Sequence, residues 1–458
     1  MPTTAWLFDL YPLGDRMVLW FLGADGRPLR LEDDFAYRLF LSGPRQRLRG
    51  LAQNLGRRGW LRRAFFTTGR ELVSGEDLPV LALELTAYAF LSPLRGLLGK
   101  LEDRFQIYNA DLDLAAYYLY ARGLHPCLWY ELDQADGRLR AASPLEDPFA
   151  PEISLPPLTT LHLGLARDPL IPLSRGNALT LSWEGRTLEV EAAGPEDLVR
   201  QVARVLRDLD PDLILSDWGD EEILPVLWDL SRRRRLALPL DREPGPVPRK
   251  PVHGRSYFSY GRIVYQGPSL PLFGRWHVDR RNSFFYREAG LMGLAQIARL
   301  GQMPLQQAAR TSPGTLITSM QLARAVADGV LIPWRKADPE RFKSAGELLT
   351  IDKGGLSFMP PIGVFADVAE LDFASMYPTI MTIHNISPET VNCACCAGKV
   401  GEGAKGRGPL PPPPHPISAN LRISVQLTIS LKYLFVTASC VEAPLNPERF
   451  DANFSNTH

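Results

Sequence analysis

The chain has few cysteines, which argues against a fold held together by disulfides. It contains five in 458 residues, and three of them lie together at Cys393, Cys395 and Cys396. A disulfide scaffold needs a larger and more evenly spaced set. Long apolar runs are also absent: no stretch of about 18 apolar residues predicts a membrane-spanning helix. The first residues, Met-Pro-Thr-Thr-Ala-Trp, lack the pattern of a secretory signal, so we expect a cytoplasmic protein.

An excess of one charge is missing too, because 51 basic residues balance 51 acidic ones. Net charge therefore gives no indication of nucleic-acid binding, and any basic surface must be local. Two local arginine clusters exist. The first is interleaved with Trp60 and Phe65 and consists of Arg45, Arg47, Arg49, Arg57, Arg58, Arg62 and Arg63. The second is the run of four from Arg232 to Arg235. For each cluster, a solvated helix face is the simpler interpretation.

The composition, 45% apolar and 22% charged, is that of a globular protein, and the length suggests about three domains. Residues 1–156 alternate short apolar strands with turns and predict a β-rich N-terminal domain. Residues 157–300 follow a proline-rich linker. Residues 301–396 begin with helices. From residue 397 onward, glycines and then Pro411 to Pro414 predict a disordered tail.

Residues 157–300 have an α/β pattern. A strand is expected at 159–166, a hairpin at 178–192 around Glu184-Gly185, a helix from Pro195, and a strand at 212–216. Pro195 suits the first helical position, and the acidic residues after it favour the positive end of the helix dipole. Further helices are expected at 286–300 and 316–328. The expected class is mixed α+β.

One segment near residue 372 carries the clearest chemical signal. Val368-Ala-Glu-Leu-Asp-Phe-Ala-Ser-Met-Tyr-Pro-Thr-Ile-Met381 places a carboxylate at the end of an apolar strand, directly before a turn. Such a carboxylate can hold a divalent cation, and turn amides can receive phosphate oxygens. The segment closely resembles motif A of the family B DNA polymerases, Asp-Phe-x-Ser-Leu-Tyr-Pro-Ser-Ile. Lys353-Gly-Gly355 resembles the family's linker before the palm, with Asp352 where tyrosine is usual.

The resemblance implies template-directed nucleotidyl transfer with two magnesium ions. Asp372 would bridge both metals, and the carbonyl of Phe373 would coordinate one. The amides of Ser375 and Met376 would receive the triphosphate, and Tyr377 would exclude a 2′-hydroxyl. The implied partners are primer–template DNA and deoxynucleoside triphosphates, with other replication or repair proteins as candidates and no membrane. The implied fold comprises the N-terminal domain, a ribonuclease-H-like exonuclease domain and an incomplete palm.

The sequence departs from the family after motif A. It contains no Asp-Thr-Asp, the family's source of the second metal carboxylate, and no fingers helix with the phosphate-binding lysine. The resemblance covers roughly residues 1–396. We therefore interpret the chain as a truncated or frame-disrupted polymerase that does not extend a primer by itself.

The nuclease motifs of the family are degenerate in this chain. Gly164 and Ala166 stand where the first motif has two carboxylates, and Ile223 stands at the aspartate of the second. In the third motif, Tyr286 is present, but Gly290 replaces the aspartate. We expect no proofreading, because a two-metal site needs those acids. The pattern resembles the exonuclease-inactivated branch found in archaea and some bacteria.

Three alternatives remain open at this stage. The chain could be a non-catalytic DNA-binding or accessory protein on the same scaffold. It could instead be a divergent nuclease using acids near the lost positions; these acids are Asp168, Asp217, Asp220 and Glu222. The three clustered cysteines could begin a zinc site, although zinc needs four ligands and incidental reduced thiols are the simpler interpretation.

Overall fold

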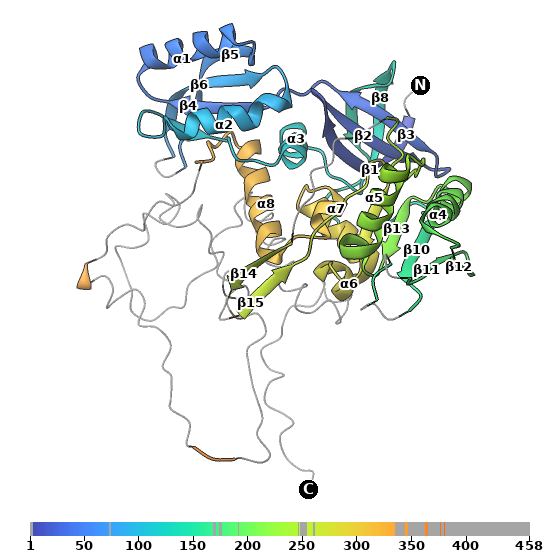
Figure 1. Ribbon diagram of the computed structural model, residues 1–458. Helices are drawn as coiled ribbons and strands as arrows, with labels where there is room; N and C mark the ends of the chain where they lie inside the picture. The colour runs from blue at the N-terminus through green and yellow to red at the C-terminus, as the bar shows by residue number, and fades with distance from the viewer. Residues whose placement is uncertain are drawn as a thin grey trace, which may run out of the picture. The chain divides into compact units, whose positions relative to one another are not determined.

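The computed structural model describes residues 3–72, 75–167, 171–173, 176–190, 192–245, 247, 254–259 and 262–334, together with 344–346, 362–364, 376 and 380. The chain divides into two compact units, Met1–Ala369 and Glu370–His458, and the elements below belong to the first (Figure 1). The class is mixed α+β, which confirms the expectation from sequence.

The chain begins with a closed five-stranded barrel. Its strands are β1 (Thr3–Leu13), β2 (Arg16–Gly23), β3 (Pro28–Asp33), β8 (Trp129–Ala135) and β9 (Arg138–Pro144), in the order β1-β2-β3-β9-β8. Helix α3 (Leu114–Arg122) contributes Tyr118 and Leu119 to the barrel's core. Asp113 caps this helix by accepting a hydrogen bond from the amide of Ala116, and Gly123 ends it in the left-handed conformation.

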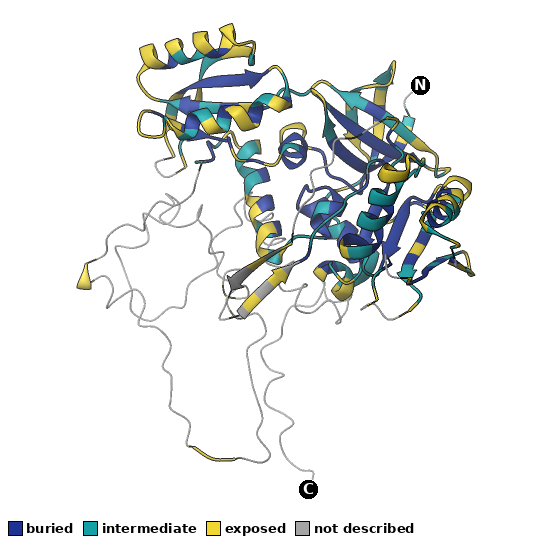
Figure 2. Ribbon diagram, viewed as in Figure 1, coloured by how far each residue is buried: buried dark blue, intermediate teal, exposed yellow. Residues whose placement is uncertain are grey.

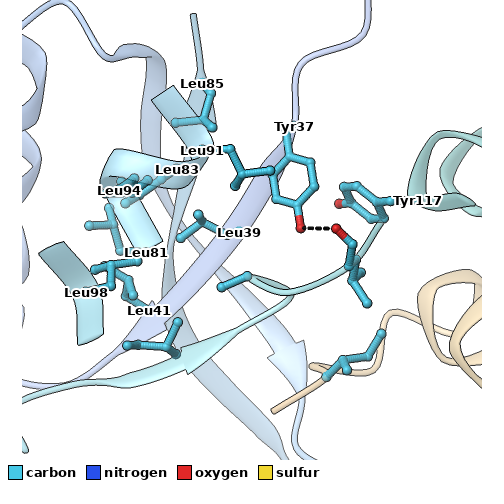
Figure 3. Packing of buried hydrophobic residues seen from close by; sticks show 14 of the residues in the cluster. Tyr37, Leu39, Leu41, Leu81, Leu83, Leu85, Leu91, Leu94, Leu98 and Tyr117 are labelled. Carbon is cyan, nitrogen blue, oxygen red and sulfur yellow. Dashed lines mark hydrogen bonds between the residues drawn. The ribbon is translucent and has the colours of Figure 1, made fainter. Parts of the chain in front are cut away.

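A second sheet is inserted between β3 and β8. Strands β4 (Arg38–Ser42), β5 (Leu61–Arg70), β6 (Asp77–Leu85) and β7 (Gln106–Tyr108) form it in the order β5-β6-β4-β7. Helices α1 (Arg45–Arg57) and α2 (Leu91–Gly99) connect its strands, and a 3₁₀ turn, η1 (Tyr88–Phe90), precedes α2. Figure 3 shows the leucines of β4, β6 and α2 packed together, with Tyr37 bonded to a backbone carbonyl.

The third sheet is mixed and has five strands. These are β10 (Thr160–Leu165), β11 (Leu179–Trp183), β12 (Arg186–Val190), β13 (Leu213–Ser216) and β16 (Trp276–Asp279), in the order β12-β11-β10-β13-β16. Strands β10, β13 and β16 are parallel, whereas the hairpin strands are antiparallel. Helices α4 (Pro195–Leu209) and α5 (Leu224–Arg234) contribute Val202, Leu206 and Leu227 to its core. The predicted order of strand, hairpin, helix and strand is confirmed.

The remaining elements are one short hairpin before β16 and three helices that follow β16 in the sequence. Strands β14 (Arg255–Ser259) and β15 (Arg262–Gln266) pair with each other, and helices α6 (Phe284–Leu300), α7 (Leu305–Ala308) and α8 (Pro313–Ala327) follow. The two predicted helices correspond to α6 and α8. Among the described residues, no helix is long and apolar enough to cross a membrane. The boundaries expected from sequence at residues 156, 300 and 396 stay predictions.

The barrel packs against the edge strand of the five-stranded sheet through aromatic side chains. The ring of Trp276 on β16 stacks on Phe8 at 4.2 Å between centroids and meets Trp6 edge-on at 5.7 Å. Its indole N–H donates to the carbonyl of Phe8. All three side chains are buried. This contact fixes the amino end of β16 against the barrel.

Candidate functional site

The carboxyl ends of the parallel strands β10, β13 and β16 meet at one edge of the five-stranded sheet. Their pairing places Leu163 opposite Ser216, and Ser216 opposite Asp279. In open α/β sheets, ligands bind at this edge. The residues around this edge therefore show whether the four replaced nuclease positions could still belong to a metal site.

The first motif lies on β10, where the structure leaves room but supplies no charge. Gly164 pairs with Thr180 of β11, and a Cβ atom added to it would meet nothing within 4 Å. Ala166 follows the strand, and its amide donates to the carbonyl of Ala178. The backbone at this end of β10 is thus held as a strand, with no carboxylate at either position.

The second motif is absorbed into the hydrophobic core. Ile223 ends a short π-helix, η3 (Gly219–Ile223), and is completely buried among the apolar side chains that line α4 and α5. A carboxylate at this position would lose its hydration to an apolar environment. The isoleucine therefore belongs to the packing of this core.

The third motif differs from the regular helix that its spacing predicts. Tyr286 lies in the first turn of α6, which Ser283 caps by accepting a hydrogen bond from the Tyr286 amide. Gly290, however, has φ 64° and ψ −164°, and it breaks the helix at that point. This conformation is open essentially only to glycine. The glycine therefore permits a kink. It does not lie within a regular helix, so the destabilisation that glycine causes there does not apply to it.

The charge at this edge comes instead from Asp220, which sequence reasoning left ambiguous. Its carboxylate has no solvent exposure and accepts two hydrogen bonds from the guanidinium of Arg310, both at 2.9 Å. The side-chain amide of Asn282 and the backbone amide of Leu270 also donate to it, at 2.9 and 2.8 Å. Burial is the largest single influence and would raise the pKa of Asp220, but the charge of Arg310 together with the hydrogen bonds from Arg310 and Asn282 holds that pKa below its usual range. The buried carboxylate is therefore ionised and neutralised by an arginine.

His277 on β16 completes this buried cluster. Its Nδ1 lies 3.5 Å from the Asp220 carboxylate and 3.0 Å from the Arg310 guanidinium, and its Nε2 lies 2.7 Å from the hydroxyl of Ser216. Burial lowers the pKa of His277, which keeps the ring neutral. A side chain at Gly219 would collide with both Ser216 and His277, so only glycine fits there. No single motif signals this cluster, because its members come from five separate segments.

The other acidic side chains at this edge also have hydrogen-bond or ion-pair partners within the protein. Asp217 forms an ion pair with Arg280, Glu222 accepts a hydrogen bond from the amide of Leu173, and Asp279 accepts from the amides of Asp220 and Arg281. Within the described ranges, no three acidic, histidine or cysteine side chains are placed to hold a metal ion. The observed donor set therefore does not fit a two-metal nuclease, and the divergent-nuclease hypothesis loses its support there. Asp168 lies outside the described residues.

The motif A residues Asp372, Phe373, Ser375 and Tyr377 also lie outside the described residues, as do the three clustered cysteines. Met376 is described, and its side chain is exposed. The assigned roles of these residues accordingly stay predictions.

The chain is similar in sequence to DNA polymerases of family B. The sequence model of DNA polymerase family B matches residues 303–402, a range that includes Asp372. A DNA polymerase of Pyrococcus glycovorans is 26% identical over 341 residues, which cover 63% of this chain and 41% of that protein. DNA polymerase 1 of Pyrococcus abyssi is 26% identical over 289 residues, covering 52% of this chain and 37% of that protein. The chain thus spans well under half the length of these relatives.

The fold is similar to a solved structure as well. The family B DNA polymerase from the hyperthermophilic archaeon Pyrobaculum calidifontis superposes with a TM-score of 0.61 at 18% identity. The superposition covers 94% of this chain and 68% of that one. At such low identity the likeness supports the shared fold alone.

Proposed function

This chain is a relative of the family B DNA polymerases, and from that premise we propose that its function is template-directed DNA synthesis. The observation that carries the proposal is the match of the family to residues 303–402, which contain Asp372 and the residues predicted to act with it. The proposed substrates are primer–template DNA and deoxynucleoside triphosphates. The proposed location is the cytoplasm.

In this proposal, the carboxylate of Asp372 and the carbonyl oxygen of Phe373 would hold magnesium. The magnesium would offset the negative charge that develops on the phosphates. Hard oxygen ligands of this kind suit magnesium. The amides of Ser375 and Met376 would receive triphosphate oxygens, and the ring of Tyr377 would lie under the sugar. One carboxylate makes only half of the required ligand set, and the sequence contains no Asp-Thr-Asp to supply the rest.

We further propose that the nuclease-like sheet has lost proofreading and persists as scaffold. The replaced positions Gly164, Ala166, Ile223 and Gly290 bring no carboxylate, and Arg310 provides the positive charge beside Asp220. A guanidinium at that carboxylate neutralises it without any metal ion. The non-catalytic alternative, a DNA-binding protein on this scaffold, differs from the main proposal only in whether synthesis ever occurs.

Primer extension tests the proposal. The 458-residue polypeptide, given a labelled primed template, four deoxynucleotides and magnesium, is expected to add no nucleotides. A protein that joins residues 1–396 to a family palm with the Asp-Thr-Asp hairpin and the fingers lysine is expected to extend the primer. In that protein, Asp372→Ala should lower the rate by at least about 100-fold. Full activity of Asp372→Ala would refute the role of Asp372, and an inactive joined protein would favour the non-catalytic alternative.

A further inference from the structure

The exposed face of α1 is basic without any compensating acid. The helix reads Arg45-Gln-Arg-Leu-Arg-Gly-Leu-Ala-Gln-Asn-Leu-Gly-Arg57, and Arg58 follows it. Leu48 and Leu55 face the core, whereas all five arginines are exposed. Figure 2 shows the outer side of α1 exposed along the helix. Within the part of the chain that the structure describes, none of these five arginines forms an ion pair.

Arginines on the other long surface helices are placed differently. On α4, Arg200 pairs with Glu196 and Arg204 with Asp208; on α5, Arg233 pairs with Asp229. Such pairs, one helical turn apart, are what a solvated helix face normally carries. The first turn of α1 holds Arg45 and Arg47, although acidic residues would stabilise that end of a helix. Helix stability therefore does not explain the arginines of α1.

Aromatic rings lie beneath and beside these arginines. The guanidinium of Arg45 lies 4.6 Å from the ring centre of Phe66 on β5, and that of Arg49 lies 5.9 Å from it. Arg58 lies 5.5 Å from the ring centre of Trp60, which stacks on Phe90. The Nε of Arg58 also donates to the side-chain oxygen of Asn54 at 3.1 Å. Cation–π contact orders a guanidinium and leaves its other N–H groups able to bind an oxyanion, so little side-chain freedom is lost on binding.

We propose that α1, together with Trp60 and Phe66, forms a binding surface for single-stranded DNA. Unpaired arginines match the charge of a phosphate backbone, and partly exposed rings beside them match unpaired bases. Only the choice of DNA as the polyanion rests on the proposed function. The surface lies on the four-stranded sheet, away from the Asp220 cluster and from the motif A segment in sequence, so it acts independently of nucleotidyl transfer.

Fluorescence anisotropy with labelled thirty-residue oligothymidylate tests the proposal in the full chain, with EDTA and without nucleotides. The variant Arg47→Gln/Arg49→Gln/Arg57→Gln should bind at least about 10-fold more weakly at low salt, with a salt slope smaller by about 2, since each single-strand phosphate contact contributes about 0.7. Glutamine keeps the helix propensity of arginine. Circular dichroism and thermal unfolding should match the unsubstituted chain.

The matched control changes the same charge on another helix. Arg232→Gln/Arg233→Gln/Arg234→Gln, in the exposed last turn of α5, should leave the affinity within about 2-fold. Equal losses in the two variants, or no loss in either, would overturn the proposal. Tighter binding of a duplex of the same length would overturn the single-strand preference. The affinity of Asp372→Ala for the oligothymidylate should equal that of the unsubstituted chain. If the catalytic proposal fails in the primer-extension test, this binding result is therefore unaffected.

Discussion

At the scale of single residues, Asp220 and Asp9 show how burial decides the charge of a carboxyl group. Asp220 is buried beside Arg310 and stays ionised. Asp9 on β1 is equally buried, and among the described residues no cation forms an ion pair with it; burial raises its pKa to about 8, although the amide of Gly274 donates to it. The first carboxyl is a charged partner, and the second carries a proton at neutral pH.

Removing the cation from Asp220 should be costly. Arg310→Met leaves a buried carboxylate without its partner and should lower the free energy of unfolding by about 3 kcal/mol. Urea denaturation measures this difference. Arg280→Met is the matched control, since its partner Asp217 is partly exposed, and it should cost at most about 1 kcal/mol. Similar costs for the two variants would show that Asp220 is not held by Arg310.

Asp9 should make the protein less stable as the pH rises. Its pKa of about 8 in the folded chain exceeds the ordinary value of 3.8, so the folded state holds a proton that the unfolded state releases. The stabilisation is complete below the ordinary value and is lost as the pH rises toward 8. Asp9→Asn, which cannot ionise, should remove roughly 3 kcal/mol of this decline between pH 5 and 8. Identical pH profiles of unfolding for the two proteins would contradict the assignment.

At the scale of elements, the kink in α6 separates Tyr286 from the rest of its helix. Gly290 has a backbone conformation that other residues avoid, and Ser283 caps the short segment before it. An aspartate introduced at residue 290 would therefore meet backbone strain in addition to lacking partner carboxylates. The residue that lacks a carboxylate, Gly290, is thus also the residue that breaks the helix.

Glycine substitutions in two helices should have opposite signs. Gly290→Ala forces an L-residue into a glycine conformation and should lower the free energy of unfolding by about 1–3 kcal/mol. Gly96 in α2 has ordinary helical geometry, and a Cβ there would meet nothing within 4 Å. Gly96→Ala should therefore stabilise the protein by about 0.5–1 kcal/mol. Thermal unfolding compares the two, and a stabilising Gly290→Ala would show that the kink is not required.

At the scale of the whole molecule, the barrel and the five-stranded sheet depend on each other. Trp276 packs on Phe8 and Trp6, and Glu243 accepts hydrogen bonds from Tyr11 and Arg30 of the barrel. If the proposed loss of proofreading is right, these contacts with the barrel are the reason the sheet keeps a well-packed core.

Magnesium should not stabilise the five-stranded sheet, where the described residues provide no metal site. Replacing EDTA by about 10 mM magnesium should leave the midpoint of thermal unfolding within about 1 °C, because ligand stabilisation requires a site on the folded state. Labelled single-stranded DNA should also remain intact under these conditions. A rise of several degrees, or degradation that disappears in Asp220→Ala, would show a metal site that the described residues do not provide.

The sequence by itself determined the resemblance to the family B DNA polymerases, the mixed class, and most strands and helices of residues 157–328, and it places no carboxylate at Gly164, Ala166, Ile223 or Gly290. These follow from local periodicity, from turn and capping residues, and from short motifs read in order. Only the tertiary structure decided that Arg310 neutralises Asp220, that Gly290 permits a kink, and that the arginines of α1 lack acids while Arg200 and Arg204 of α4 are paired. Side chains from distant segments meet only after the sheets pack, so their pairing leaves no pattern along the chain.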